Sequence, residues 1–118
     1  MSSFVPFKKR YNLDKRRMLC EEMTMNCEDA YPLICERSSA SNMPDLRRSR
    51  FVVKAQMTVG VFLRLIRSQL PLAEDETIFL FVENTLPQMT TTMGELHLKH
   101  ADEDGFLYVN YQEESVYG

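Results

Sequence analysis

The stretch from Thr58 to Val82 constrains the fold of this chain most strongly, because it joins a clear helix pattern to a clear strand pattern. Thr58 is a suitable helix cap, and Pro71 ends the helical pattern that follows it. The apolar residues that recur at helical spacing are Val59, Phe62, Leu63, Ile66 and Leu70. The run TIFLFV, from Thr77 to Val82, is β-rich and apolar on both faces, which predicts a central strand.

Two further strand patterns precede this helix. The segment 31–36 predicts a strand with cover on both faces, because Ile34 is apolar as well as the residues that alternate with it. Pro32 has no backbone donor, so we expect it at a gap in the hydrogen-bond ladder. Beyond the turn residues 38–44, the run RFVVK at 50–54 predicts a second strand that pairs back on the first. Its basic ends are typical of an edge strand.

The start of the chain predicts two helices. A short one is expected over residues 6–10, with Pro6 in its first turn, and a longer one over residues 13–27, which contain neither Gly nor Pro. The apolar stripe of the longer helix is Leu19, Met23 and Cys27. We expect both helices to pack on the sheet face opposite the helix that begins at Val59, because Ile34 would otherwise be exposed.

The C-terminal third completes the fold pattern. Thr92 and Glu95 form a capping box that opens a short helix ending at His100, and FLYVNY at 106–111 predicts the last strand. Apart from the N-terminal helices, the order is strand, strand, long helix, strand, short helix, strand, which is the ubiquitin-like β-grasp arrangement of the α+β class. We therefore expect one compact domain with three parts: a helical extension at 1–27, a β-grasp domain at 28–111 and an exposed tail at 112–118.

Length and composition bound the location of the protein. A chain of 118 residues is about the size of one ordinary domain. Its densest apolar run, at 78–82, is far shorter than the roughly 20 residues that span a bilayer. Residues 1–10 are polar and basic where a secretory signal has its apolar region. These features predict a cytosolic protein.

Charge is distributed unevenly along the chain. Residues 1–54 carry 11 Lys or Arg against 7 Asp or Glu, whereas residues 55–118 carry 3 against 10. The charge runs are either solvated faces or sites for acidic peptides or anionic lipid. Nucleic acid is a less suitable ligand for these clusters than an acidic peptide or anionic lipid, since the net charge is −3 and no stacking aromatics are interleaved among the arginines. The two basic clusters are Lys8, Lys9 and Arg10, and Arg47, Arg48 and Arg50.

The cysteines and histidines indicate neither a metal site nor an enzyme. Cys20, Cys27 and Cys35 match no metal or redox spacing, and we expect them to be reduced and at least partly buried. His97 and His100 lie three residues apart, yet no further ligands complete a metal site. A Cys–His hydrolase needs a thiolate beside an imidazole, and no sequence feature brings these residues together. No catalytic residue and no cofactor is predicted.

Three stretches of the chain carry a resemblance to a known family. They are MTVGVFLRLIRSQL from Met57, LPLAEDETIFLFVEN from Leu70, and LPQMTTTMGELHLKHADEDGFLYVNYQEESVYG from Leu86. Together they closely resemble the autophagy ubiquitin-like modifiers related to GABARAP and microtubule-associated light chain three. The similarity runs from about Leu13 to Gly118, and its most specific part is the ending FLYVNYQEESVYG, with an aromatic residue and glycine after a strand.

The resemblance implies a β-grasp domain with two additional N-terminal helices and no catalysis of its own. It also implies that Gly118 is joined to phosphatidylethanolamine by activating and conjugating enzymes, with a processing or delipidating cysteine protease as a further partner. The chain would be a cytoplasmic monomer that is held on the autophagosomal membrane once lipidated. There it would recruit cargo receptors and adaptors.

The same resemblance implies two apolar pockets beside the edge strand. An acidic aromatic-x-x-aliphatic peptide would add to this edge as a further strand, with its aromatic residue in the first pocket and its aliphatic residue in the second. The first pocket would use Leu19, Met23, Pro32, Ile34, Arg50, Val52 and Phe106. The second would use Phe51, Val53, Met57, Phe62, Leu65, Ile66 and Arg67. The acidic flanks of the peptide would reach Arg48, Arg50 and Lys54.

The chain departs from the family pattern at several positions, and its ligand preference can differ accordingly. Leu19 stands where a glutamate is usual, Lys54 where proline is usual, and Cys27 where tyrosine is common. Ala30 and Gln69 occupy positions that are often basic. The alternative function is a ubiquitin-like trafficking adaptor that binds peptides and is never conjugated. The two functions differ in whether Gly118 is conjugated.

Overall fold

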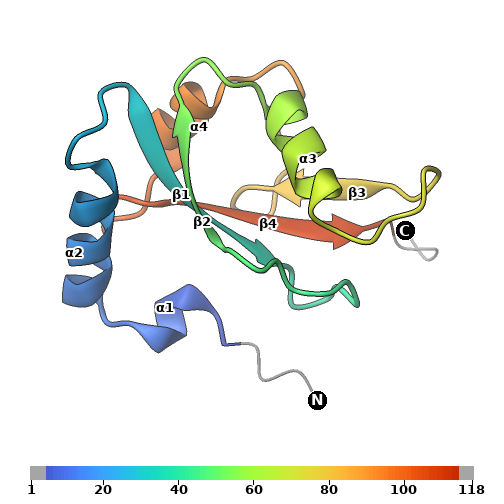
Figure 1. Cartoon of the computed structure of the whole chain (residues 1–118), viewed down its shortest axis with the longest axis horizontal. Coiled ribbons are helices and arrows are strands. Elements are labelled where there is room, and N and C mark those ends of the chain that lie inside the picture. Colours follow the sequence, from blue (N-terminus) through green and yellow to red (C-terminus); the bar gives the residue numbers. More distant parts are fainter. Residues whose placement is uncertain (1–4, 115–118) are drawn as a thin grey trace.

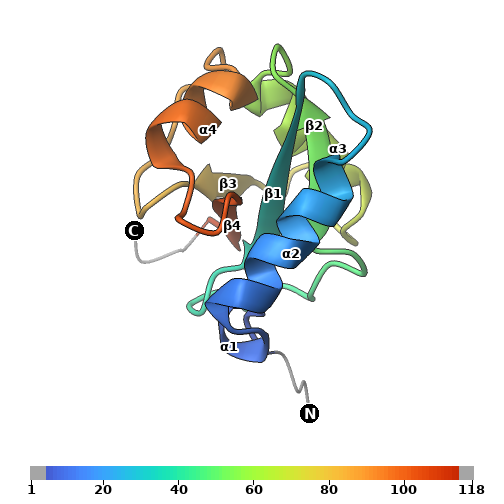
Figure 2. The same cartoon turned by 90° about the vertical axis from the view of Figure 1, so that its left-hand side faces the viewer.

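A computed structural model of the chain describes residues 5–114 as a sheet with helices on both of its faces (Figures 1 and 2). The strand order is β2-β1-β4-β3, with β1 antiparallel to β2, parallel to β4, and β3 antiparallel to β4. Along the described residues the elements are α1 (Phe7–Arg10), α2 (Leu13–Thr24), β1 (Ala30–Arg37), β2 (Arg50–Lys54), α3 (Val59–Ser68), β3 (Ile78–Phe81), α4 (Met93–His100) and β4 (Leu107–Glu113).

Side-chain caps begin the three longer helices. The carbonyl oxygen of the Asn12 side chain accepts from the backbone N–H of Lys15 at 2.9 Å, which starts α2. The hydroxyls of Thr58 and Thr92 do the same for α3 and α4, at 3.3 and 3.2 Å. The predicted boundaries hold to within three residues: α2 ends at Thr24 rather than at residue 27, and β4 continues to Glu113 rather than ending at 111.

The position predicted for the TIFLFV run is wrong. Its strand, β3, lies at an edge of the sheet, and the strand that runs parallel to β1 in the centre is β4. Ile78 and Leu80 are buried, but Phe79 and Phe81 on the opposite face are only partly covered. An apolar residue at every position therefore does not mean cover on both faces here, because α2 packs on β1 and α1 contacts β1 through Phe7.

The sheet separates two apolar clusters. On one face, α3 and α4 pack over the residues of β1 that include Leu33 and Cys35. On the other, Phe7 of α1, Ile34 and Phe106 form a second cluster, against which residues of α2 pack. This arrangement confirms that the N-terminal helices cover the face opposite α3. Those α2 residues are Leu19, Cys20 and Met23.

The cysteines differ in their surroundings. Cys35 is fully buried in the α3 side of the core, and burial raises the pKa of its thiol. Cys20 of α2 is partly buried where this helix packs against the cluster of Phe7, Ile34 and Phe106. The prediction for Cys27 is wrong: it is exposed, because α2 ends at Thr24 and the chain turns away before reaching it.

Gly105 marks a tight approach between α2 and the turn before β4. Its φ is +96°, and a Cβ built there would lie 2.7 Å from the Sγ of Cys20. We expect Gly105→Ala to lower the free energy of unfolding by about 1–3 kcal/mol, as measured by urea denaturation. In a Cys20→Ala background the loss should be smaller, since only the backbone strain remains. An equal loss in both backgrounds would contradict the close contact.

Candidate functional site

The outer edge of β2 offers backbone groups at regular spacing. The N–H of Cys35 donates to the carbonyl of Ser49 at 2.8 Å, which makes this a hydrogen-bonded pair in the β1–β2 ladder. Along an antiparallel ladder, hydrogen-bonded and non-hydrogen-bonded pairs alternate. The pair of Leu33 with Phe51 is therefore hydrogen-bonded, and the pair of Pro32 with Val52 is not. The N–H and C=O groups of Arg50 and Val52 therefore point away from β1. Within residues 5–114, no strand pairs with that edge.

The same geometry explains Pro32. Its nitrogen points away from β2, toward the side on which β4 lies. Pairing of β1 with β4 begins one residue later, at Leu33 with Leu107. The missing donor thus falls just before that ladder starts, as the sequence predicts.

A groove of about 700 Å³ lies beside this edge, between β2 and the N-terminal helices. It brings the two basic clusters of the sequence together, because Arg10 of α1 faces the arginines that lead into β2. Its wall thus carries cations from segments far apart in the chain, which suits an acidic ligand. The groove is lined by Phe7, Arg10, Met23, Arg47, Arg48, Ser49, Arg50, Phe51 and Val52.

The residues expected in the first pocket fall into two layers. Met23, Arg50 and Val52 line the groove, and Val52 is 40% exposed. Pro32, Ile34 and Phe106 are buried and Leu19 is partly buried, so these residues support the groove from below or from its side. The sequence-based set lacked four lining residues, of which Arg10 and Arg47 were already marked by their charge clusters. The four are Phe7, Arg10, Arg47 and Ser49.

The residues expected in the second pocket lie on the α3 side of β2. Val53, Phe62 and Ile66 are buried in the core. The ring of Phe51 packs edge-on against Phe62, with 5.5 Å between the ring centroids. Leu65 is 37% exposed, and Met57 is partly buried against the core.

The charged residues expected in the peptide site differ in their contacts and exposure. The guanidinium of Arg67 donates to the carbonyl of Glu76 at 2.5 Å and of Ala73 at 3.4 Å, which orders the loop after α3. Lys54 and Arg48 are exposed. Among the residues expected in the second pocket, those at least partly accessible to solvent are Phe51, Met57, Leu65 and Arg67.

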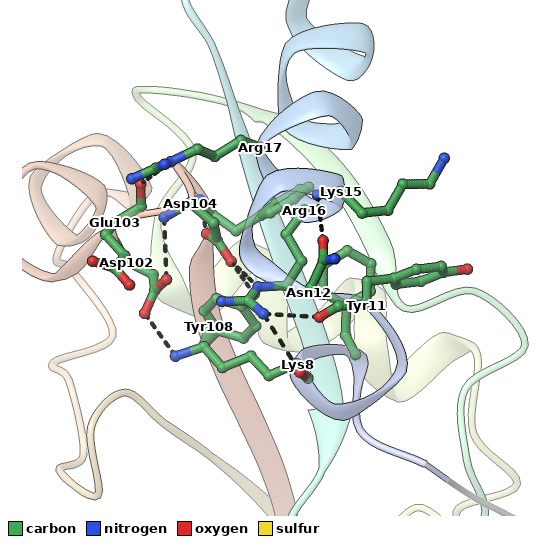
Figure 3. Close-up of polar contacts among 12 residues, drawn as sticks. Lys8, Tyr11, Asn12, Lys15, Arg16, Arg17, Asp102, Glu103, Asp104 and Tyr108 are labelled. Atoms are coloured by element: carbon green, nitrogen blue, oxygen red, sulfur yellow. Dashed lines mark hydrogen bonds and ion pairs between the residues drawn. The ribbon is translucent and has the colours of Figure 1, made fainter.

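A polar cluster holds the N-terminal helices in place (Figure 3). The Nε of Arg16 lies 2.8 Å from Oδ2 of Asp104, whose side chain is fully buried. The same carboxylate accepts from the hydroxyl of Tyr108 and, at 2.8 Å, from the N–H of Phe106. Burial, together with the hydrogen bond to this carboxylate, raises the pKa of Tyr108. Arg16 also donates to the carbonyl of Tyr11 at 2.9 Å, which ties α2 to the residue that follows α1.

A second ion pair flanks this cluster. The Nζ of Lys8 lies 2.6 Å from Oδ1 of Asp102 and 4.4 Å from the ring centroid of Tyr108. Partial burial acts to raise the pKa of Asp102, but the hydrogen bonds from Lys8 and from the N–H of Asp104 bring it below its usual value. Each N-terminal helix is therefore held to the turn before β4 by one ion pair, α1 through Lys8 and α2 through Arg16. Nothing in the sequence pattern indicated either ion pair.

The histidines are engaged in local contacts. The Nε2 atom of His97 lies 2.9 Å from the carbonyl oxygen of Gly105, and the Nδ1 atom of His100 lies 3.2 Å from Oε2 of Glu83. Over residues 5–114, no group of three or more His, Cys, Asp or Glu side chains could hold a metal ion. In the same range no helix has the length and apolar character needed to cross a membrane.

Comparison with known proteins identifies the family. Residues 15–118 match the family described as autophagy protein Atg8, ubiquitin-like. The chain belongs to the Atg8 family. It is 38% identical over 112 residues to autophagy-related protein 8 of Eremothecium gossypii, covering 95% of this chain and 93% of that protein. Autophagy-related protein 8d of Arabidopsis thaliana is 37% identical over 112 residues, with the same coverage.

A solved structure agrees with the fold of this Atg8-family chain. It superposes on the crystal structure of Trypanosoma brucei ATG8 with a TM-score of 0.88 at 28% identity, covering 98% of this chain and 100% of that one. The ubiquitin-like α+β fold predicted from the sequence is thereby confirmed, as is the family. Gly118 falls within the matched residues, but it lies outside the range that the structure describes.

Proposed function

We propose that this ubiquitin-like autophagy modifier is joined through Gly118 to phosphatidylethanolamine and recruits receptors that carry acidic aromatic-x-x-aliphatic peptides. Membership of the Atg8 family supports the conjugation. The observation that carries the recruitment is the outward-facing backbone of Arg50 and Val52 beside a groove lined with arginines. The competing function, an adaptor that is never conjugated, shares the groove and differs only in the fate of Gly118.

The chemistry of conjugation is supplied by other proteins, and this chain contributes no catalytic group. The carboxylate of Gly118 attacks the α-phosphorus of ATP on an activating enzyme, which releases pyrophosphate and leaves an acyl-adenylate. An enzyme thiolate then displaces AMP to form a thioester. The amine of phosphatidylethanolamine attacks the thioester carbonyl, loses a proton and expels the thiolate, which leaves an amide. Lipidation moves the chain from the cytoplasm to the autophagosomal membrane, and a cysteine protease can process or release it.

Peptide docking follows from the geometry of the edge. An extended segment would pair with the free N–H and C=O groups of Arg50 and Val52. Its aromatic residue would enter the groove above Phe7 and Met23, and its aliphatic residue would lie near Phe51 and Leu65. Acidic flanks would meet Arg48, Arg50 and Lys54. A contact of this size is below that of a standard interface, so we expect a Kd on the order of micromolar.

Pairing of the peptide with the backbone of β2 can be tested at one group, the N–H of Val52. Val52→Pro removes an N–H that points away from β1, so the β1–β2 ladder loses no hydrogen bond. We expect calorimetry with an acidic aromatic-x-x-aliphatic peptide to show binding weakened by roughly fivefold, since one hydrogen bond is worth about 1 kcal/mol. Val52→Ala keeps the N–H and serves as the matched control, with a smaller effect.

Side-chain recognition needs a separate variant. The double substitution of Arg50 and Phe51 by alanine removes a cation of the groove and a ring beside it. Unchanged affinity in this variant, or equal affinity of Val52→Pro and Val52→Ala, would place the peptide elsewhere. Circular dichroism should confirm that each variant remains folded.

A further inference from the structure

The carboxylate of Glu113 ties the end of β4 to the loop between β1 and β2. Its Oε1 accepts from the hydroxyl of Ser41 at 2.6 Å, and its Oε2 accepts from the backbone N–H of Asn42 at 2.9 Å. Glu113 is the last residue of β4, where it pairs with Ile78. Both carboxylate oxygens are thus held by a segment about 70 residues away in the sequence.

The loop side of this contact is rigidly built. Ser41 is only 3% exposed, and its Oγ also accepts from the N–H of Met43 at 3.0 Å. The carbonyl of Ser41 accepts from the guanidinium of Arg37 at 2.8 Å, which fixes the loop to the end of β1. Partial burial acts to raise the pKa of Glu113, but the bonds from Ser41 and Asn42 lower it below its usual value. Glu113 is therefore a charged acceptor at neutral pH.

The contact stands close to the residue proposed to react. Gly118 is five residues beyond Glu113, so the chain between them spans at most roughly 17 Å. On the other side, the N–H of Glu114 donates to the carbonyl of Thr77 at 3.0 Å. The end of β4 is thus attached to two separate segments of the domain: Glu113 to the loop at Ser41 and Asn42, and Glu114 to Thr77.

We propose that the contact between Glu113 and Ser41 is a positioning device for conjugation. It joins the end of β4 to the loop between β1 and β2, and so sets the place on the domain from which the chain leads to Gly118. Glu113 is a positioning residue on this view, and the inference rests on the proposed conjugation of Gly118. Without the contact, the end of β4 is held only by its backbone pairing with β3, and any residue that frays from this end must be ordered again when the activating enzyme binds it. Ordering one residue is enough to change binding by roughly fivefold or more.

The test is ATP–pyrophosphate exchange by the purified activating enzyme of the Atg8 system, measured against concentration of the full chain. We expect Glu113→Ala, which removes both bonds, to raise the KM for the chain by about fivefold at nearly constant kcat. Ser41→Ala leaves the bond from the Asn42 N–H in place and should raise the KM by a smaller factor, and the double variant should behave like Glu113→Ala. Glu113→Gln keeps one acceptor oxygen and replaces the other by an NH₂ donor, so its KM should fall between those of wild type and Glu113→Ala. Glu114→Ala, next in the chain and exposed, is the matched control with an unchanged KM.

Ser41→Ala decides between positioning and direct recognition, because it removes a bond to Glu113 without changing Glu113 itself. If Glu113→Ala raises KM while Ser41→Ala does not, the enzyme reads Glu113 itself and the positioning role is lost. Unchanged KM in every variant, with exchange by the wild type, overturns this inference and leaves the proposed function standing. Absence of exchange by the wild type overturns both. Thermal melting of each variant separates a change in KM from unfolding.

Discussion

Replacing Asp104 by alanine is expected to lower the free energy of unfolding by about 3–5 kcal/mol, a large part of the total of a small domain. The substitution leaves the guanidinium of Arg16, 11% exposed, without its partner. It also removes the acceptor of the Tyr108 hydroxyl and of the Phe106 N–H. Urea denaturation followed by far-UV circular dichroism measures the loss, since the chain has no Trp for fluorescence.

The neighbouring ion pair provides the matched control. The side chain of Lys8 is 47% exposed, so solvent screens its attraction to Asp102. We expect Lys8→Ala to cost less than about 1 kcal/mol and to lose most of that effect at high salt. Equal losses for Asp104→Ala and Lys8→Ala would show that burial does not distinguish the two pairs.

The Asp104 cluster also bears on function. Arg16 connects α2 and the end of α1 to the turn before β4, and α1 supplies Phe7 and Arg10 to the groove. Loosening α1 should therefore weaken peptide binding even at temperatures where the β-grasp core remains folded. Lys8→Ala should leave that binding nearly unchanged.

The sequence predicted the elements well where one physical signal dominated. The apolar spacing of the helix from Val59 and the caps at Thr58 and Thr92 correspond to α3 and α4. The placement of β3 failed because Phe79 and Phe81 make the strand look covered on both faces, although α1 and α2 pack on β1 instead. Periodicity reports the character of a face and not what lies against it.

The site was predictable in its local part only. The edge strand with its basic ends and the alternation of Arg50 and Val52 follow from adjacent residues. The pairing of Arg16 with Asp104 spans 88 residues, and nothing local to either indicates the other. The charge cluster of Arg10 was visible in the sequence, but its place in the groove depends on a similar long-range approach, between α1 and the segment at 47–52. Contacts between distant segments thus account for what sequence reasoning missed.

The second large effect is expected at Gly118, where Gly118→Ala should abolish conjugation. Glycine has no Cβ, so it can thread a narrow channel and present its carbonyl in conformations closed to other residues. The variant should form no detectable amide with phosphatidylethanolamine when incubated with the activating and conjugating enzymes, ATP and vesicles. Mass spectrometry measures the added lipid directly.

The rest of the molecule should not respond to this substitution. The peptide groove is built from residues between Phe7 and Val52, so Gly118→Ala should bind the acidic peptide with wild-type affinity and melt at the same temperature. Ser115→Ala changes a nearby residue without altering the reacting one and should still be conjugated. In cells the Gly118→Ala protein should remain cytosolic, because anchoring depends on the two acyl chains, which contribute about 0.8 kcal/mol per buried CH₂. If it nevertheless gained a lipid mass and a membrane location, conjugation would not require glycine at position 118, which would overturn this prediction. If the wild type gained none, the unconjugated adaptor would be the function that the groove serves.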